Sequence, residues 1–271
     1  MNGGWWKCGL AAMGMVVLAG VAGAETVDLK TAADWSKNPA LKISEDGVLT
    51  LSGRRADISS TPFEIDPAKK YKISMEIRRT PGSPENICYI GNWSLDAGKK
   101  PMQPYYVMSV AKTDSTLAEA AIKGSKTVMI MKPAGWAEDF QKRNWGLVFN
   151  AKPDLSDLPN DSYNVVTAAE VDGDKVKLTL RSPLGQDYPA GTATRFHSSG
   201  SGMYAGWAGK PAPEEWTPIS WVVTGASKSG NHAKIWWANA KYGAVRIIAN
   251  YNPAVKDSAL EVRNVKLEVL D

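Results

Sequence analysis

Hydrophobic and polar residues alternate strictly along the segment 71–78. The apolar side chains occupy every second position, and lysine, serine, glutamate and arginine fill the positions between them. A second alternating run, 265–270, ends the chain with Val265, Leu267 and Val269 on one side. A period of two predicts a β-strand with one buried face and one exposed face. We therefore predict that both runs are inner strands of one antiparallel sandwich.

Other apolar runs, separated by turns rich in glycine and proline, predict further strands. These runs lie at 87–93, 219–224, 233–237, 244–250 and 259–270. In the last run the apolar positions change parity between Val262 and Val265. One extra residue near Arg263 and Asn264 predicts a β-bulge there.

The pattern of the chain changes between residues 109 and 197, where the predicted strands are shorter and the turns closer together. A Ser/Gly segment, 198–202, then predicts a flexible linker. From residue 203 onward the strand pattern is again that of residues 25–108. We predict one domain made from 25–108 plus 203–271, with 109–197 inserted as a second domain.

The first 24 residues predict a secretory signal peptide. One lysine precedes an apolar run of about 14 residues, and a small-x-small site lies just before Glu25. A membrane anchor is the alternative, but the run is shorter than the roughly 20 residues that span a bilayer. We expect export, to the periplasm or the exterior. Removal of the leader leaves Cys88 as the single cysteine, so no disulfide within the chain is possible.

The two outer parts resemble the carbohydrate-binding modules built on the galactose-binding-like jelly roll. The matching stretches are TPFEIDPAKKYKISMEIR, AVRIIANYN and LEVRNVKLEVLD. The middle part, through TLAEAAIKGSKTVMI and YNVVTAAEVDGDKVKLTLRSPLGQDYPAGTATR, resembles a small β-barrel that recurs as an insert in secreted and phage proteins. Together the resemblances imply an all-β fold, an antiparallel jelly-roll sandwich with an inserted small β-barrel. The jelly-roll resemblance implies a polysaccharide or glycan as partner, whereas the β-barrel resemblance implies a fold and no activity.

Tryptophan is abundant, with eleven residues against four phenylalanines. Sugar binding uses flat aromatic faces against the C–H groups of pyranose rings, with polar side chains for the hydroxyls. Adjacent tryptophans on a strand must face opposite sides, so one of Trp236 and Trp237 is expected to face outward. The alternative for every tryptophan is packing in the core. The candidate ligand-binding residues are Trp93, Trp207, Trp237, Trp236, Tyr105, Arg78 and Asn92.

The resemblance also implies a structural calcium ion where the first and last strands meet. Glu25, Asp28 and Glu268 are the candidate ligands, since calcium prefers carboxylate oxygens. The acidic loop 154–161 lacks the spacing of an EF-hand, which favours turn and capping roles for its aspartates.

Catalytic and nucleic-acid functions have little support in the sequence. His197 and His232 are isolated and belong to no zinc or nucleophile motif. Basic and acidic residues are interspersed, with a net charge of +4, and no basic aromatic tract is present. A secreted, non-catalytic glycan-binding module is the best hypothesis. A structural or protein-interaction module of the envelope surface is the second, and a polysaccharide hydrolase or lyase the third.

Overall fold

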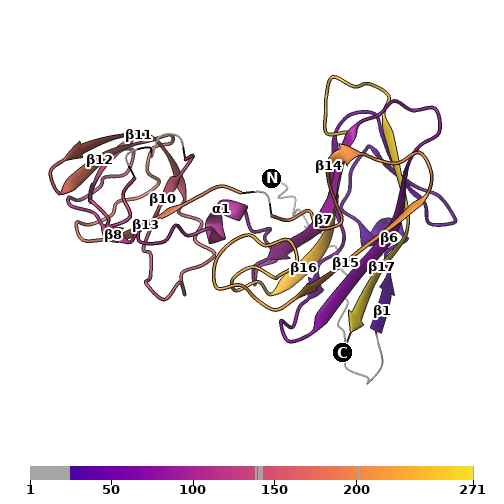
Figure 1. Cartoon of the computed structure of the whole chain (residues 1–271), viewed down its shortest axis with the longest axis horizontal. Helices are drawn as coiled ribbons and strands as arrows, with labels where there is room; N and C mark the ends of the chain where they lie inside the picture. Colours follow the sequence, from indigo (N-terminus) through magenta and orange to yellow (C-terminus); the bar gives the residue numbers. More distant parts are fainter. Residues whose placement is uncertain (1–24, 138, 140–142, 201, 271) are drawn as a thin grey trace, which may run out of the picture.

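A computed structural model describes residues 25–137, 139, 143–200 and 202–270. It consists of a β-sandwich lobe and a smaller barrel lobe, with a short helix, α1 (Pro104–Val107), between them (Figure 1). Every pairing between named strands is antiparallel, so the predicted all-β antiparallel fold class is confirmed. The predicted signal peptide lies outside the described residues. None of the described helices has the length and apolar character needed to cross a bilayer.

One sheet of the sandwich, the β6 sheet, has six strands and combines both ends of the chain. Its order is β15–β6–β17–β3–β2, and β1 pairs with the end of β17. A single 3-10 turn, η1 (Ala32–Asp34), lies between β1 and β2. The strands are β15 (Thr217–Thr224), β6 (Lys70–Arg79), β17 (Ala259–Leu270), β3 (Leu49–Ser52), β2 (Leu41–Ile43) and β1 (Glu25–Asp28).

The second sheet of the sandwich, the β7 sheet, has five strands. Its order is β14–β7–β16–β4, with β5 paired to β16. The strands are β14 (Trp207–Pro211), β7 (Ile87–Leu95), β16 (Tyr242–Ala249), β4 (Ala56–Ser59) and β5 (Phe63–Glu64).

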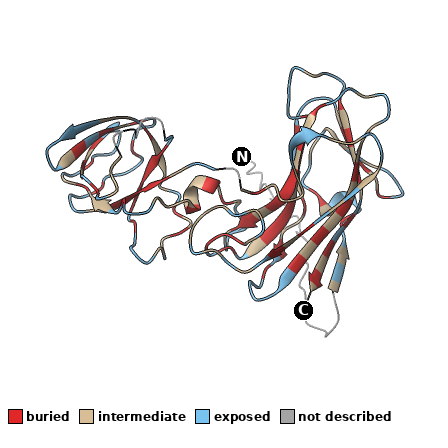
Figure 2. Cartoon of the chain, viewed as in Figure 1, coloured by how far each residue is buried: buried red, intermediate tan, exposed pale blue. Residues whose placement is uncertain are grey.

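The alternation predicted for 71–78 and 265–270 is present in β6 and β17. The apolar positions of both strands are buried, and they face one core with the apolar positions of the β7 sheet. Figure 2 shows this as bands of buried residues along the strands, with exposed residues in the loops at the ends. The register between β17 and β6 shifts between Arg263 and Lys266, which confirms the predicted bulge.

Trp236 and Trp237 correct the sequence prediction. The segment 233–237 forms turns and one isolated bridge instead of a strand, so the rule of opposite faces does not apply. Trp236 is 0% and Trp237 1% exposed, and both belong to the sandwich core. The Trp237 amide donates to Ser94 Oγ at 3.1 Å, and its indole N–H donates to the His232 carbonyl at 3.0 Å. These bonds satisfy an irregular backbone that directs two consecutive rings inward.

The core also holds the single thiol of the described chain. Cys88 lies on the inner side of β7, and burial raises its pKa to about 12 despite the nearby charge of Lys210.

The barrel lobe contains six short strands in the order β8–β13–β10–β11–β12–β9. The two ends of this sheet meet, since Leu117 forms a bridge with Ile130 and the Ala118 amide donates to the Met129 carbonyl at 2.9 Å. The sheet therefore closes around a hydrophobic cluster of its own. The strands are β8 (Ser115–Thr116), β13 (Ala193–His197), β10 (Gly146–Phe149), β11 (Asn164–Asp172), β12 (Lys175–Leu180) and β9 (Thr127–Met131).

The chain returns from the barrel across the outer side of the β7 sheet. The Asn92 amide donates to the Met203 carbonyl at 3.1 Å, and the Gly206 amide donates to the Ile90 carbonyl at 3.1 Å. Between these bonds lies Gly91. A Cβ atom at Gly91 would lie 1.9 Å from the Met203 oxygen, so only glycine permits this close crossing.

Gly91→Ala should therefore destabilise the protein by about 1–3 kcal/mol, because the methyl group forces the returning segment away from β7. Urea unfolding followed by tryptophan fluorescence measures the change. Gly185→Ala is the matched control, since a Cβ there meets open space. Equal midpoints for Gly91→Ala and the wild type would contradict the close packing of Met203 on β7.

Candidate functional site

The outer face of the β7 sheet carries a row of aromatic rings, which we call the aromatic face. The face consists of Tyr89, Trp93, Tyr204 and Tyr251, together with Arg55, Asp57 and Arg246. Tyr89 and Trp93 lie two positions either side of Gly91 on β7, and therefore share its outward side. Tyr204 comes from the segment that crosses Gly91.

Arg246 is fixed at the centre of this face. Its guanidinium lies over the Trp93 ring, 4.0 Å from the centroid, and donates to the Tyr204 hydroxyl at 3.3 Å. Asp57 accepts two hydrogen bonds from Arg246, at 3.0 and 2.6 Å. Such a forked pair holds the guanidinium in one plane, so Trp93 and Tyr204 both contact a positioned cation.

The row continues through Tyr89 to Tyr251. The Tyr89 ring lies 4.9 Å from the Tyr204 ring and 4.9 Å from the Tyr251 ring, and Arg55 lies over Tyr251 at 4.5 Å. Tyr251 is 39% exposed, which makes it one of the few large apolar side chains exposed in the described chain. The face thus offers the Tyr251 ring, the Arg55 guanidinium and the Asp57 carboxylate to solvent, whereas the Arg246 side chain is only 13% exposed.

The other predicted binding residues do not join Trp93 on this face. Trp207 lies at the edge of the β7 sheet, packed partly against the core, and its indole N–H donates to the Lys210 carbonyl at 3.1 Å. Lys210 covers the ring at 3.9 Å. Asn92 is 2% exposed and accepts a hydrogen bond from the Trp221 indole at 3.0 Å. It therefore joins the two sheets inside the core.

Arg78 and Tyr105 lie elsewhere. Arg78 is on the outer side of the β6 sheet, where it pairs with Glu261 at 2.6 Å and covers Trp216 at 4.5 Å. Tyr105 is in α1, and its ring stacks on Tyr163 of the barrel at 4.5 Å. The predicted set is therefore divided between the core, both outer faces and the junction of the lobes.

No protein-family model, curated protein or solved structure matches the chain.

The predicted calcium ligands do not converge. Glu25 and Asp28 are three positions apart on β1, so their side chains leave opposite sides of the strand. Glu268 lies on β17 opposite Thr26 and pairs with Lys72 at 2.8 Å. Across the described residues, no three histidine, cysteine, aspartate or glutamate side chains gather in a way that could hold a metal ion.

Sequence reasoning missed most of the aromatic face. Tyr89 could have been found, because it shares its parity with Trp93 on a predicted strand. Arg246 and Asp57 are 189 residues apart in sequence, and only the pairing of β16 with β4 brings them together. Tyr204 could not be placed, since no alternation marks the crossing segment.

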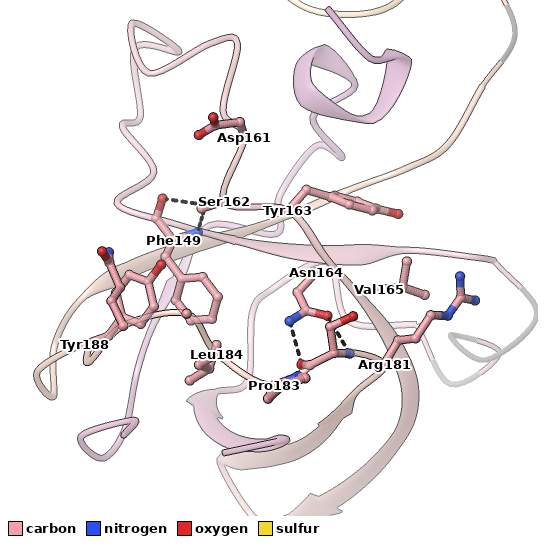
Figure 3. A pocket seen from close by; sticks show the side chains of 13 residues that line it. Phe149, Asp161, Ser162, Tyr163, Asn164, Val165, Arg181, Pro183, Leu184 and Tyr188 are labelled. Atoms are coloured by element: carbon pink, nitrogen blue, oxygen red, sulfur yellow. Dashed lines mark hydrogen bonds between the residues drawn. The ribbon is translucent and has the colours of Figure 1, made fainter. Parts of the chain in front are cut away.

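A concave surface lies on the barrel, and we call it the barrel pocket (Figure 3). It is an open pocket of about 540 Å³ between the start of β11 and the loop that follows β12. Its lining residues are Phe149, Asp161, Ser162, Tyr163, Asn164, Val165, Arg181, Ser182, Pro183, Leu184, Gly185, Gln186 and Tyr188.

A buried polar network lies where the barrel meets α1. Arg195, 1% exposed, donates to Asp157 at 2.8 Å and to His197 Nε2 at 3.2 and 3.1 Å. His197 Nδ1 lies 2.8 Å from the Tyr105 carbonyl, which can only accept, so Nδ1 carries the proton. Burial raises the pKa of Asp157, but hydrogen bonds from Asn160 and the Lys152 amide and the Arg195 charge outweigh it and hold the pKa low. His197 is thus held in its neutral form by contacts within the fold.

Acid should destabilise the protein through His197. Burial lowers its pKa from 6.5 to about 4, so the unfolded chain binds the extra proton first as the pH falls. The stabilisation is complete above pH 6.5 and is lost toward pH 4. The free energy of unfolding should fall by roughly 2–3 kcal/mol between pH 7 and pH 4.5 from this group alone.

Urea titrations at pH 7 and pH 4.5 measure this fall in the free energy of unfolding. In His197→Gln most of the fall should be absent. His232→Gln is the matched control, because His232 is exposed and should leave the pH dependence unchanged. An unaltered pH dependence in His197→Gln would contradict the assignment.

Proposed function

We propose that the chain is an exported, non-catalytic carbohydrate-binding protein that holds its glycan on the aromatic face. The observation that carries the proposal is the continuous row from Trp93 through Tyr204 and Tyr89 to Tyr251, partly exposed and interleaved with guanidiniums. A pyranose ring presents C–H groups to such rings and hydroxyls to the charged groups beside them.

The polar groups of the face suit hydroxyl recognition. Asp57 supplies carboxylate lone pairs, and Arg55 supplies guanidinium donors at the exposed end of the row. Arg246 donates to Asp57 and Tyr204 and so holds both side chains in place, which means that a ligand does not have to order them. The face combines apolar contact with fixed polar groups, as saccharide binding requires.

The fold hypothesis that accompanies this function is the galactose-binding-like jelly roll with an inserted barrel. It is supported by two antiparallel sheets around one core and by the pairing of the first strand, β1, with the last, β17. The division of hydrophobic residues into two clusters, one in each lobe, supports the insertion at 109–197.

The alternative functions have less support. A protein-interaction module of the envelope predicts a contiguous exposed apolar surface. The large hydrophobic side chains exposed in the described chain are Ile122 and Val171 on the barrel and Tyr251 on the sandwich. A glycoside hydrolase requires two facing carboxylates in a cleft, and the described lining of the barrel pocket holds one, Asp161.

Tyr251→Ala should weaken glycan binding about tenfold or more, because it removes the most exposed ring of the row. A glycan array and affinity electrophoresis on a polysaccharide panel identify the ligand and measure the loss. Trp216→Ala is the matched control. The Trp216 ring is likewise an aromatic ring beside arginine, being half-buried under Arg78 and Arg263, but it lies on the opposite face of the sandwich.

Equal loss in both variants would move the site away from the aromatic face. Full retention of binding by Tyr251→Ala would refute the site outright, and failure to bind any glycan would refute the proposed function.

Export predicts removal of residues 1–24. Mass spectrometry of the protein from the secreted or periplasmic fraction should find Glu25 as its first residue. A chain that stays cytoplasmic with its leader attached would contradict the proposal.

A further inference from the structure

The barrel pocket has the size of a small-ligand site, and its lining is rich in polar groups. Its volume of about 540 Å³ falls in the range of pockets that hold small molecules. Its walls combine aromatic and aliphatic groups with a guanidinium, amides and a carboxylate. The pocket is separate from the aromatic face, because it belongs to the barrel and its own hydrophobic cluster.

Several polar groups of the pocket are already engaged within the fold. The Asn164 amide donates to the Ser182 carbonyl at 2.8 Å, and its oxygen accepts from the Ser182 amide at 3.3 Å (Figure 3). The Ser162 hydroxyl lies 2.6 Å from Asn160 Oδ1 and accepts from the Phe149 amide at 2.8 Å. These bonds fix the two walls of the pocket, and leave other side chains to meet a ligand.

Of the two charged side chains in the pocket, Asp161 is paired within the described part of the chain and Arg181 is not. Asp161 lies 3.4 Å from the Lys100 ammonium, so its charge is partly compensated from outside the pocket. The Arg181 guanidinium has no ion-pair or hydrogen-bond partner among the residues that the structure describes. The pocket therefore presents one uncompensated cation.

Tyr163 lies beside this cation. In Figure 3 the Tyr163 and Arg181 side chains extend toward the same end of the pocket, on either side of Val165. Burial raises the pKa of Tyr163, with Arg181 opposing that effect by its charge, so the phenol stays protonated and can donate. Tyr163 is also held in place, because it stacks on Tyr105 and lies across Gly146, where a Cβ would come within 2.2 Å of its ring.

We propose that the barrel pocket binds an acidic sugar residue of a glycan, with its carboxylate on Arg181 and the Tyr163 hydroxyl and its ring against Val165 and Pro183. A planar guanidinium and a phenol are matched to a carboxylate, which accepts from both. That the ligand is a saccharide rests on the proposed function. That it carries a carboxylate is inferred from Arg181 and Tyr163 in the pocket. The barrel then adds charge selectivity to the aromatic face.

The test compares three probes on the full chain by isothermal titration calorimetry. They are a trimer of galacturonic acid, the same trimer with its carboxyl groups reduced to alcohols, and a short polyglutamate peptide. The acidic trimer should bind, and the reduced trimer and the peptide should bind at least about tenfold more weakly.

Arg181→Ala should weaken binding of the acidic trimer by about tenfold or more. Arg181→Lys should weaken it by less, since lysine keeps the charge but lacks the two parallel N–H donors of the guanidinium. The matched control is Arg54→Ala, an exposed arginine of the sandwich lobe, which should bind as the wild type does. Unchanged binding in Arg181→Ala, equal binding of the reduced trimer, or preference for the peptide would each overturn the proposal.

Tyr251→Ala separates the two sites. If Tyr251→Ala no longer binds the acidic trimer and Arg181→Ala still does, the barrel site is overturned and the aromatic face remains as the binding site. Loss in Arg181→Ala with retention in Tyr251→Ala would support the barrel site even where the glycan array refutes the aromatic face.

Discussion

The pairing of β17 is the constraint on which the sandwich depends. This one strand hydrogen-bonds β6 along one side, and β3 and β1 along successive parts of the other. A backbone with unpaired amides cannot be buried without a large cost in free energy. The chain must therefore bring its last segment between its early strands, however much sequence intervenes. The bulge near Asn264 lets β17 keep apolar residues on the core side along its whole length.

That constraint explains how the barrel is accommodated. The chain leaves the sandwich after β7 through α1 and returns along the outside of β7, so departure and return lie at the same sheet. The junction is held by specific bonds. The Asn160 amide donates to the Tyr106 carbonyl at 2.9 Å, and the Asn239 side chain donates to the Leu158 carbonyl at 2.6 Å. With the His197 contact to Tyr105, these bonds connect loops of both lobes to α1 and to each other.

The sequence predicts those parts of the fold in which a local rule governs the side chains. The strict alternation in β6 and β17 reflects one buried face, and the parity change in β17 predicts the bulge. The two tryptophans at 236–237 were misplaced because irregular backbone can direct neighbours the same way. The aromatic face and the barrel pocket each need strand pairings or loops that are distant in sequence. No pattern in the sequence around Arg181 or Tyr163 indicates that the two side chains lie close together.

The burial of Cys88, the one thiol among the described residues, has a chemical consequence. A thiolate is the species that attacks disulfides and oxidants. With a pKa of about 12 and 2% exposure, Cys88 holds only about one part in 10⁵ as thiolate at pH 7. Oxidants and mixed disulfides thus have almost nothing to react with in the folded state. A covalent dimer through Cys88 therefore requires that the sandwich first open around this position.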